Sequence, residues 1–378
     1  PERCGFVQQI TFDINDVFEN YDLPGTYIGY YVINNGHINS TFSIDFKSED
    51  GQIKSYVLQH INTNVFKNPD QLMQNITAVS DHLRKKILQE GGDPERENLN
   101  VIKTKTGGTY FVDSDGRHWR LYNYIADSYT CQRIEDPKTF YNAAKAFGHF
   151  QCRLADFPID TLHETIPNFH HTVWRFENFK ESIKNDPKDR AKTVKAEIDF
   201  AFERESDAGV LLALADNGEL PLRVTHNDTK LNNVMFDLHT DEGICVIDLD
   251  TVMPGLSLYD FGDSIRFGAN TAAEDEKDVS KVSLDIELYE TYVRGYLASA
   301  GKSLTKAEID YLPFSAKLLT FECGLRFLTD YLNGDVYFKT AYDDHNLVRC
   351  RTQFALVADM EKKMEQMVEI TQRAYKEL

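Results

Sequence analysis

The sequence contains few cysteines, and none of them is close to another. The 378 residues include 6 cysteines. They lie far apart and form no Cys-x-x-Cys pair: Cys4, Cys131, Cys152, Cys245, Cys323 and Cys350. A zinc ribbon needs closely spaced thiols and a disulfide framework needs a high density of them, so neither class of fold is expected. The pattern indicates a chain with reduced thiols.

Long apolar runs are also missing. The longest lies around Ala208–Ala215, far shorter than the roughly 20 residues that cross a bilayer. The segment Pro1–Ile10 lacks the apolar stretch of a secretion signal. From these two observations we expect a cytoplasmic protein without a membrane partner.

Positive charge is in deficit. The chain has 41 Lys and Arg against 60 Asp and Glu, a net charge of -19, and no dense basic run. Because an acidic surface repels polyphosphate backbones, nucleic acid is not expected as a partner. The composition, 42% hydrophobic and 27% charged, is that of an ordinary globular protein, which excludes disordered and fibrous chains. The length fits one large fold or two lobes.

Short β-rich segments, separated by Gly, Asn and Asp, occupy residues 27–123. They predict an antiparallel sheet, with strands at residues 30–33, 40–46, 54–59, 101–104, 109–112 and 119–122. The pairs Asp50-Gly51 and Asp115-Gly116 predict hairpin turns, because glycine readily takes the positive φ that these turns need. One helix, from Asn68 to about Gln89, interrupts the strands with apolar residues at helical spacing.

Long helical segments dominate after Ile125. The periodicity predicts helices at residues 137–154, 176–205, 283–300, 305–332 and 347–378. Thr305 and Glu308 have the spacing of a capping box, and Gly301 is a plausible helix end before it. A short β segment, Arg223–Asp250, separates the second helix from the third. The sequence therefore predicts an α+β fold of two lobes, a small antiparallel-sheet lobe with one helix and a larger, mainly helical lobe.

The short β segment carries three oxygen-bearing side chains that suit phosphoryl transfer. Asp228 and Asn233 have the spacing His-x-Asp-x-x-x-x-Asn with His226, and the apolar strand at 244–247 leads directly to Asp248. Phosphoryl transfer needs an acceptor beside the attacking hydroxyl and oxygen ligands for Mg²⁺ on the phosphates. Asp228 suits the first role. Asn233 and Asp248 suit the second, since Mg²⁺ prefers carboxylate and amide oxygens.

This region resembles the aminoglycoside phosphotransferase and choline kinase branch of the protein-kinase-like fold, and more closely the N-acetylhexosamine 1-kinases. The likeness is carried by residues 226–233, 247–255 and 259–263, with 36–39, 56–59 and 324–328 in support. The resemblance implies that Asp228 is the catalytic base and that Asn233 and Asp248 bind the metal. It also implies a nucleotide-binding lobe at residues 1–123 and a catalytic and substrate-binding lobe at 124–378.

The activity implied by the resemblance is the transfer of phosphate to a sugar. ATP and Mg²⁺ would be the cofactors, and the acceptor would be the anomeric hydroxyl of N-acetylglucosamine or N-acetylgalactosamine. Two other functions stay open. One is a kinase of the same fold for choline, homoserine or an aminoglycoside. A quaternary ammonium acceptor such as choline would need an aromatic cage. The other is a nucleotide- or sugar-binding protein without catalysis. The oligomeric state does not follow from the sequence.

Three further charged residues lie close to this motif. Asp260-Phe261-Gly262 spells the metal-binding triplet of protein kinases, yet it follows a Pro-Gly loop rather than an apolar strand. We therefore expect Asp260 to be a structural carboxylate that braces the catalytic loop. Asp250 should point to the same side of its strand as Asp248, where it joins the metal or substrate site or is solvated. Lys230 has the spacing at which related kinases place a lysine on the transferred phosphate; the alternative is an exposed lysine.

The connection between the first two predicted strands is the candidate nucleotide loop. It contains Gly36, His37 and Asn39, and its backbone N–H groups could cover phosphates. With one glycine it is, taken alone, an ordinary hairpin.

The ion pair that protein kinases form between a strand lysine and a helix glutamate has no counterpart in these positions. Gln59 occupies the place of the lysine, and residues 65–89 contain no glutamate. Either Gln59 contacts the phosphates as a neutral donor, or Lys54, Lys67 or another cation serves instead.

Substrate choice is expected in the helical lobe. Glu322, Arg326 and Asp330 recur every four residues along the helix predicted at 305–332. They form either an exposed ladder of ion pairs or, as the resemblance favours, a pocket wall in which Arg326 and Asp330 contact the sugar. Tyr337 is a further candidate contact. The pair His170-His171 fits a substrate loop better than a metal site, because no carboxylate partner is apparent.

Overall fold

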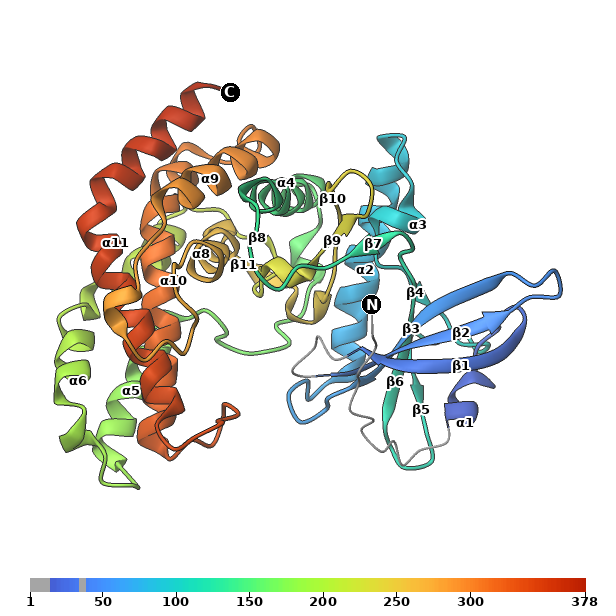
Figure 1. Ribbon diagram of the computed structural model, residues 1–378, viewed down its shortest axis with the longest axis horizontal. Helices are drawn as coiled ribbons and strands as arrows, with labels where there is room; N and C mark the ends of the chain where they lie inside the picture. The colour runs from blue at the N-terminus through green and yellow to red at the C-terminus, as the bar shows by residue number, and fades with distance from the viewer. Residues whose placement is uncertain (1–13, 34–38) are drawn as a thin grey trace.

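The computed structural model describes residues 14–33 and 39–378, and an antiparallel sheet forms most of its first lobe (Figure 1). The strand order is β1-β2-β3-β6-β4, and β5 pairs with β6. The strands are β1 Thr26–Ile33, β2 Ser40–Lys47, β3 Ile53–Ile61, β4 Val101–Ile102, β5 Phe111–Val112 and β6 His118–Asn123. All the pairings are antiparallel, as predicted. The predicted turn glycines Gly51 and Gly116 both have positive φ.

The helix α2, Pro69–Gln89, packs on one face of this sheet. It begins where predicted, because the Asn68 side chain accepts the N–H of Gln71 and Pro69 occupies the first turn. Its buried stripe joins a core that continues into the second lobe. The lobe holds two helices more than expected, α1 Ile14–Phe18 and α3 Pro94–Glu97. They are only 5 and 4 residues long, too short for a helical period to show in the sequence.

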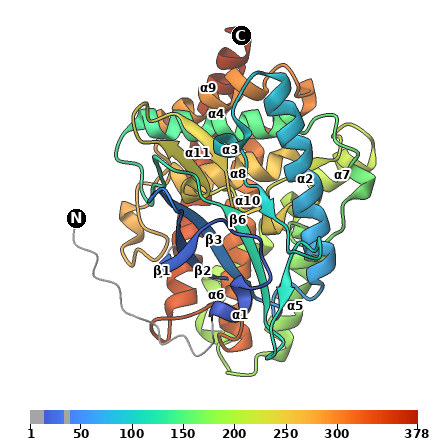
Figure 2. The same ribbon diagram turned by 90° about the vertical axis from the view of Figure 1, so that its right-hand side faces the viewer.

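Helices make up most of the second lobe, which lies behind the sheet and α2 when the molecule is viewed from the N-lobe side (Figure 2). They are α4 Pro137–Arg153, α5 Thr172–Asn185, α6 Lys195–Phe202, α7 Val210–Asp216, α8 Ser257–Gly268, α9 Ile286–Ala300, α10 Lys306–Asn333 and α11 His345–Lys376. The long helix α10 packs against α5, α8 and α11. The predicted capping box of Thr305 and Glu308 is present at its start. Within the described ranges, none of the helices combines the length and the apolar character needed to cross a membrane.

The single helix predicted at residues 176–205 is wrong. The chain forms α5 and α6 instead, with a break in which Asp186 and Asp189 have φ of 31° and 54°. Pro187 follows Asp186 and has no N–H to continue the helix. The Asp186 carboxylate accepts the backbone N–H groups of Arg190 and Ala191 and so stabilises the turn.

Two small sheets lie where the lobes meet and carry the motif residues. One has the order β10-β9-β7 and the other pairs β11 with β8. Their strands are β7 Ser128–Tyr129, β8 Arg223–Thr225, β9 Val234–Asp237, β10 Gly243–Val246 and β11 Met253–Gly255. Val246 lies opposite Val234, and Met253 lies opposite Thr225. The pairing brings the segments that precede and follow these strands close together. The predicted two-lobed α+β fold is confirmed.

Candidate active site

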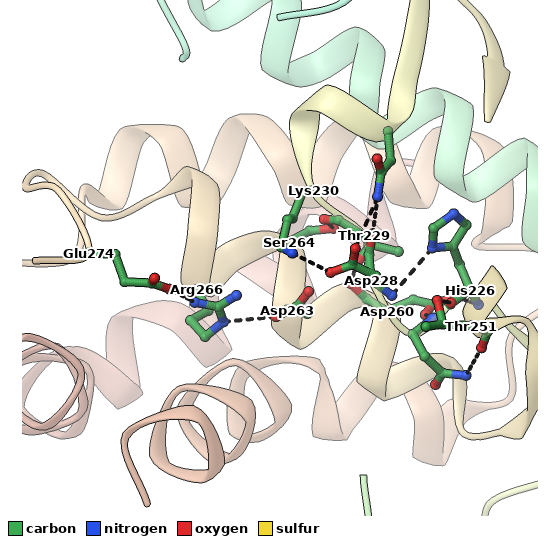
Figure 3. Close-up of polar contacts among 12 residues, drawn as sticks. His226, Asp228, Thr229, Lys230, Thr251, Asp260, Asp263, Ser264, Arg266 and Glu274 are labelled. Carbon is green, nitrogen blue, oxygen red and sulfur yellow. Dashed lines mark hydrogen bonds and ion pairs between the residues drawn. The ribbon is translucent and has the colours of Figure 1, made fainter. Parts of the chain in front are cut away.

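The catalytic loop follows β8 and is anchored from beneath by Asp260 (Figure 3). The Asp260 carboxylate accepts the N–H groups of His226 (2.9 Å) and Asn227 (2.7 Å) and the side-chain amide of Gln151 (2.8 Å). Burial raises the pKa of Asp260, and these hydrogen bonds oppose the rise. Asn227 takes a φ of 65°, which turns the chain so that Asp228 leaves the buried layer. The prediction that Asp260 braces this loop is confirmed.

The imidazole of His226 joins the catalytic loop to the segment that carries Asp248. Its Nδ1 lies 3.3 Å from the N–H of Asp228 and accepts it. The proton is therefore on Nε2, which donates to the Ile247 carbonyl at 2.8 Å. The Thr251 hydroxyl donates to the His226 carbonyl at 2.6 Å. Both segments are thus fixed by one side chain.

Asp228 and Lys230 form an ion pair at the surface of this loop. Lys230 Nζ lies 2.6 Å from Asp228 Oδ1, and the two side chains are 30% and 27% exposed. Partial burial alone would lower the pKa of Lys230, but the carboxylates of Asp228 and Asp263 outweigh it and raise the pKa. Asp263 is itself paired with Arg266 (Figure 3). Lys230 is therefore held beside the Asp228 carboxylate and is not a freely solvated lysine.

Two oxygen groups beside Asp228 have no partner among the described residues. Asn233 donates its amide N–H groups to the carbonyl (2.8 Å) and Oδ2 (3.3 Å) of Asp228, which leaves its Oδ1 free. The backbone carbonyl of Asn233 accepts the N–H of Ile247 at 2.9 Å. This bond holds the chain next to Asn233 at the residue before Asp248. Asp248 has a φ of 61° and keeps contact with solvent. The surrounding protein and the charges of Asp250 and Asp228 raise its pKa to about 7.

These groups fit Mg²⁺. The cation takes oxygen ligands, keeps several waters, and is usually bound through one or two carboxylates together with substrate phosphates. The free amide oxygen of Asn233 and the unneutralised carboxylate of Asp248 match that requirement. Among the described residues, no group of three His, Cys, Asp or Glu could hold a metal ion by itself. A metal at this place would be held by Asn233 and Asp248 together with waters or a bound phosphate.

Asp250 does not lie on a strand, so the expected alternation with Asp248 is wrong. Residues Leu249–Thr251 form a 3₁₀ turn, η5, after the left-handed Asp248. The Asp250 side chain is 4% exposed and its Oδ1 lies 2.6 Å from Arg120 Nη2. Its Oδ2 accepts a hydrogen bond from Asn39 at 2.5 Å. The solvated alternative is also wrong, because Asp250 is buried and paired.

Gln59 contacts the buried guanidinium of Arg120, the partner of Asp250. It lies opposite Arg120 in the β3–β6 pairing, and its Oε1 accepts from Arg120 Nε (3.0 Å) and Nη2 (2.8 Å). Lys54 and Lys67 are exposed residues. The sequence reading missed Arg120, although a single arginine in a strand between Trp119 and Leu121 was a visible signal. The candidates Gly36 and His37 lie outside the described residues.

The charged stripe on α10 faces the protein and is not an exposed ladder. Glu322 is buried, and it accepts from His170 Nδ1 (2.8 Å) and the Thr172 hydroxyl (2.6 Å). The other ring nitrogen of His170 lies 3.2 Å from the Asn227 carbonyl. A series of hydrogen bonds therefore connects Glu322 of α10, through His170, to the catalytic loop. His170 therefore has a carboxylate partner in Glu322, which the sequence did not reveal because the two residues lie far apart along the chain.

The guanidinium of Arg326 contacts two aromatic rings. Its guanidinium carbon is 5.5 Å from the Phe169 ring centre and 5.6 Å from that of Phe338. Arg175 lies nearby and donates to the Phe169 carbonyl at 2.8 Å. Burial and the charge of Arg326 lower the pKa of Arg175 to about 10. Neither arginine forms an ion pair with the described residues.

Asp330 braces the loop that carries Tyr337. Its two oxygens accept the N–H groups of Val336 (3.0 Å), Tyr337 (2.8 Å) and Phe338 (3.0 Å) and the side-chain amide of Asn346 (2.9 Å). Four hydrogen bonds leave the carboxylate no free acceptor for a sugar in this arrangement. Tyr337 is 66% exposed. The geometry favours an indirect role for Asp330 and leaves Tyr337 as a candidate contact.

The fold and the catalytic loop together define the class of this molecule, a phosphotransferase with a protein-kinase-like fold. Residues 32–306 match the model of the phosphotransferase enzyme family, APH. Since the match covers well over half of the chain, the chain belongs to that family.

Solved structures with the same fold share little sequence with this chain. An aminoglycoside phosphotransferase from Alicyclobacillus acidocaldarius subsp. acidocaldarius is 13% identical over 100% of both chains, with a TM-score of 0.60. A choline kinase from Cryptosporidium parvum is 17% identical over 93% of this chain and 95% of its own, with a TM-score of 0.55. The amicoumacin kinase hAmiN, solved with AMP-PNP and Ca²⁺, is 13% identical over 91% and 89%, with a TM-score of 0.54. At these identities the likeness shows the fold alone.

Proposed function

We propose that the protein transfers the γ-phosphate of ATP to the anomeric hydroxyl of an N-acetylhexosamine, N-acetylglucosamine or N-acetylgalactosamine. The choice of acceptor rests on the sequence resemblance, and one observation carries the phosphoryl-transfer part of the proposal. Asp228 is paired with Lys230 and lies beside two unpartnered oxygen groups, on Asn233 and Asp248. A base, a cation and two hard metal ligands are the parts that phosphoryl transfer needs.

The chemistry follows from the positions of these groups. Mg²⁺ held by Asn233 and Asp248 would neutralise the phosphates of the nucleotide. Asp228 accepts or orients the proton of the attacking hydroxyl, which then attacks the γ-phosphorus in line with the leaving oxygen of ADP. Lys230 stabilises the charge that develops on the transferred group. Positioning and charge supply most of the catalysis, so rigid anchors such as Asp260 are expected beneath the loop.

The residues around Arg326 favour an acceptor rich in hydrogen-bond-accepting oxygens. Among the described residues, Arg326 and Arg175 have no carboxylate in an ion pair, and Tyr337 is exposed on the loop that Asp330 holds. Hydroxyl and acetamide oxygens would accept from these groups. A quaternary ammonium such as choline would need an aromatic cage, but here the rings of Phe169 and Phe338 already contact the guanidinium of Arg326. This argues against the choline alternative.

An acceptor panel tests the proposal. The protein is incubated with ATP and Mg²⁺, and ADP release is measured with each hexosamine, choline, homoserine and an aminoglycoside. We expect release with N-acetylhexosamines and a product whose phosphorus couples to the anomeric proton in ³¹P NMR. The methyl glycoside of the same sugar is the matched control, because its anomeric oxygen is blocked. Release with another alcohol alone would favour a kinase of that alcohol, and no release with any acceptor would favour a non-catalytic binder.

A further inference from the structure

The chain lacks the strand lysine and helix glutamate of protein kinases, and its buried cation comes from another strand. Arg120 lies on β6, directly opposite Gln59 on β3. Its side chain is 1% exposed, which makes it one of the most deeply buried charged groups in the described chain. A buried guanidinium needs a partner, because its desolvation is costly. The partner identifies what the residue holds.

The countercharge of Arg120 does not come from the helix that packs on the sheet. From α2 the guanidinium meets the thioether of Met73, with Nη1 3.8 Å from the sulfur. The carboxylate that neutralises it is that of Asp250, 2.6 Å away. Asp250 lies in the turn η5, which belongs to the second lobe. Burial would lower the pKa of Arg120, but Asp250 and the Tyr122 hydroxyl outweigh it and raise the pKa. The ion pair therefore runs between the lobes.

The same contact point gathers the end of the nucleotide loop. Asn39 donates to Asp250 Oδ2 at 2.5 Å, and its own Oδ1 accepts the N–H of Asn62 at 3.0 Å. Gln59 accepts from Arg120 and donates to the Thr41 hydroxyl at 3.0 Å. Strands β2, β3 and β6 and the turn η5 are thereby joined through one guanidinium and one carboxylate.

Resting on the proposed kinase function, we propose that Arg120 is a positioning residue, which replaces the missing lysine–glutamate pair by a cross-lobe ion pair with Asp250. By holding Asp250 it fixes η5 and, with it, the direction of Asp248. By holding Gln59 and, through Asp250, Asn39, it aligns the start of β2 with the metal-binding segment. Arg120 therefore sets the distance between the sheet that covers the nucleotide and the oxygens that bind its metal.

The variant R120Q tests this assignment, with R204Q as the matched control. Arg204 makes a two-point ion pair with Glu361 at 2.9 and 2.8 Å. Both of these residues lie in the helical lobe, so this pair does not connect the two lobes. We expect R120Q to weaken binding of Mg²⁺·AMP-PNP at least about tenfold and to lower kcat, because small displacements of reacting groups are costly. R120K should lie between R120Q and the wild type. R204Q should lower Tm without changing nucleotide affinity.

The double variant R120Q/D250N separates positioning from simple stability. Removing both charges leaves no unpaired buried ion, so Tm should recover relative to R120Q. Affinity for Mg²⁺·AMP-PNP should stay low, because the turn and the sheet are no longer tied. Affinity and kcat that recover together with Tm would show that the pair only stabilises the fold. Wild-type affinity and kcat in R120Q itself would also overturn the proposal.

Hydrogen exchange in the ligand-free protein keeps this inference separate from the proposed function. R120Q should speed exchange both in η5, at the Val252 N–H bonded to Leu249, and in the first residues of β2. Faster exchange confined to β6 would overturn the cross-lobe role, whether or not the wild type phosphorylates any acceptor. A wild type without kinase activity, but with coupled exchange in both segments, would refute the proposed function and support the ion pair.

Discussion

Asp228 is the residue on which the proposed chemistry depends, and its surroundings keep it both fixed and reachable. The N–H of Asp228 is held by His226, its carbonyl by Asn233 and its carboxylate by Lys230. The side chain is nonetheless 27% exposed. A rigid base that remains open to the acceptor is what general-base catalysis needs.

Replacing this carboxylate tests its role. D228N keeps the size of the side chain but removes the proton acceptor, so we expect turnover to fall by at least about 10²-fold. Affinity for Mg²⁺·AMP-PNP should change little. Single-turnover phosphate transfer and calorimetric nucleotide binding measure the two quantities. Full activity in D228N would contradict the assignment of Asp228 as the base.

The sequence revealed some of these residues and hid others for a physical reason. Asp228, Asn233 and Asp248 lie within one short β segment, so their spacing, together with the strand before Asp248 and the family resemblance, predicts that they lie close together. Arg120 and Asp250 meet only because the two lobes pack together, and no local pattern records that contact. The orientation of Asp250 was missed because a left-handed residue replaced the expected strand.

At the scale of elements, the helix α10 serves both the fold and the site. Its first turn binds Arg223 through Glu308. Its middle reaches the catalytic loop through Glu322 and His170 and places Arg326 beside Phe169. Its last turn, through Asp330, holds residues 336–338, which we call the rim loop. A change at either end of this helix is therefore expected to have a distinct effect, one on stability and the other on acceptor binding.

The start of α10 should show a stability that depends on pH. Glu308 accepts from Arg223 (2.6 and 2.7 Å), from the Ser257 hydroxyl (2.6 Å) and from the N–H of Thr305 (2.7 Å). Burial would raise the pKa of Glu308, but these contacts outweigh it and lower the pKa. A carboxylate whose pKa is lowered in the folded state stabilises the protein at pH values above its ordinary, unfolded-state pKa. This stabilisation is lost as the pH falls through the lowered pKa of the folded state.

We therefore expect E308Q to lower the free energy of unfolding by about 3 kcal/mol at pH 7. The difference from the wild type should shrink as pH drops below about 4. T305A is the comparison, since losing the neutral cap costs about 1 kcal/mol at either pH. Urea unfolding at both pH values measures the effects. A loss for E308Q that is the same at both pH values would contradict the ionised carboxylate.

The end of α10 should control acceptor binding. D330N replaces the carboxylate, which has two acceptor oxygens, by an amide that has one. The amide cannot accept all the N–H groups of Val336, Tyr337 and Phe338. The rim loop should loosen, so KM for the acceptor rises about tenfold while KM for ATP stays unchanged. Steady-state kinetics with each substrate varied in turn measures the split. D343N, at an exposed aspartate close by, is the control and should behave like the wild type.

Element prediction succeeded where local chemistry decides. The Asn68 and Thr305 caps and the turn glycines mark their helices and hairpins directly in the sequence. The break after α5 was missed because Asp186-Pro187 lies inside a charged, otherwise helical stretch, in which periodicity outweighed the helix-ending proline. The short helices of the N-lobe carry no period and so could not be read.

At the scale of the whole molecule, the net charge of -19 opposes an anionic substrate. Long-range repulsion should slow the approach of Mg²⁺·ATP at low salt. Raising the ionic strength from about 0.01 to 0.15 M shortens the screening length from about 30 to about 8 Å. We therefore expect the association rate of a fluorescent nucleotide analogue, measured by stopped flow, to increase several-fold with salt. KM for an uncharged sugar should stay constant, and a slower association at high salt would contradict this expectation.

The way in which Asp330 holds the rim loop has a consequence for the evolution and engineering of acceptor preference. The carboxylate binds backbone amides, so the anchor does not depend on which side chains follow it. Val336 and Tyr337 are 78% and 66% exposed and can change without loss of that anchor. A library randomised at these two positions should therefore alter selectivity on an unchanged scaffold, in the way that antibody loops diversify on a constant framework.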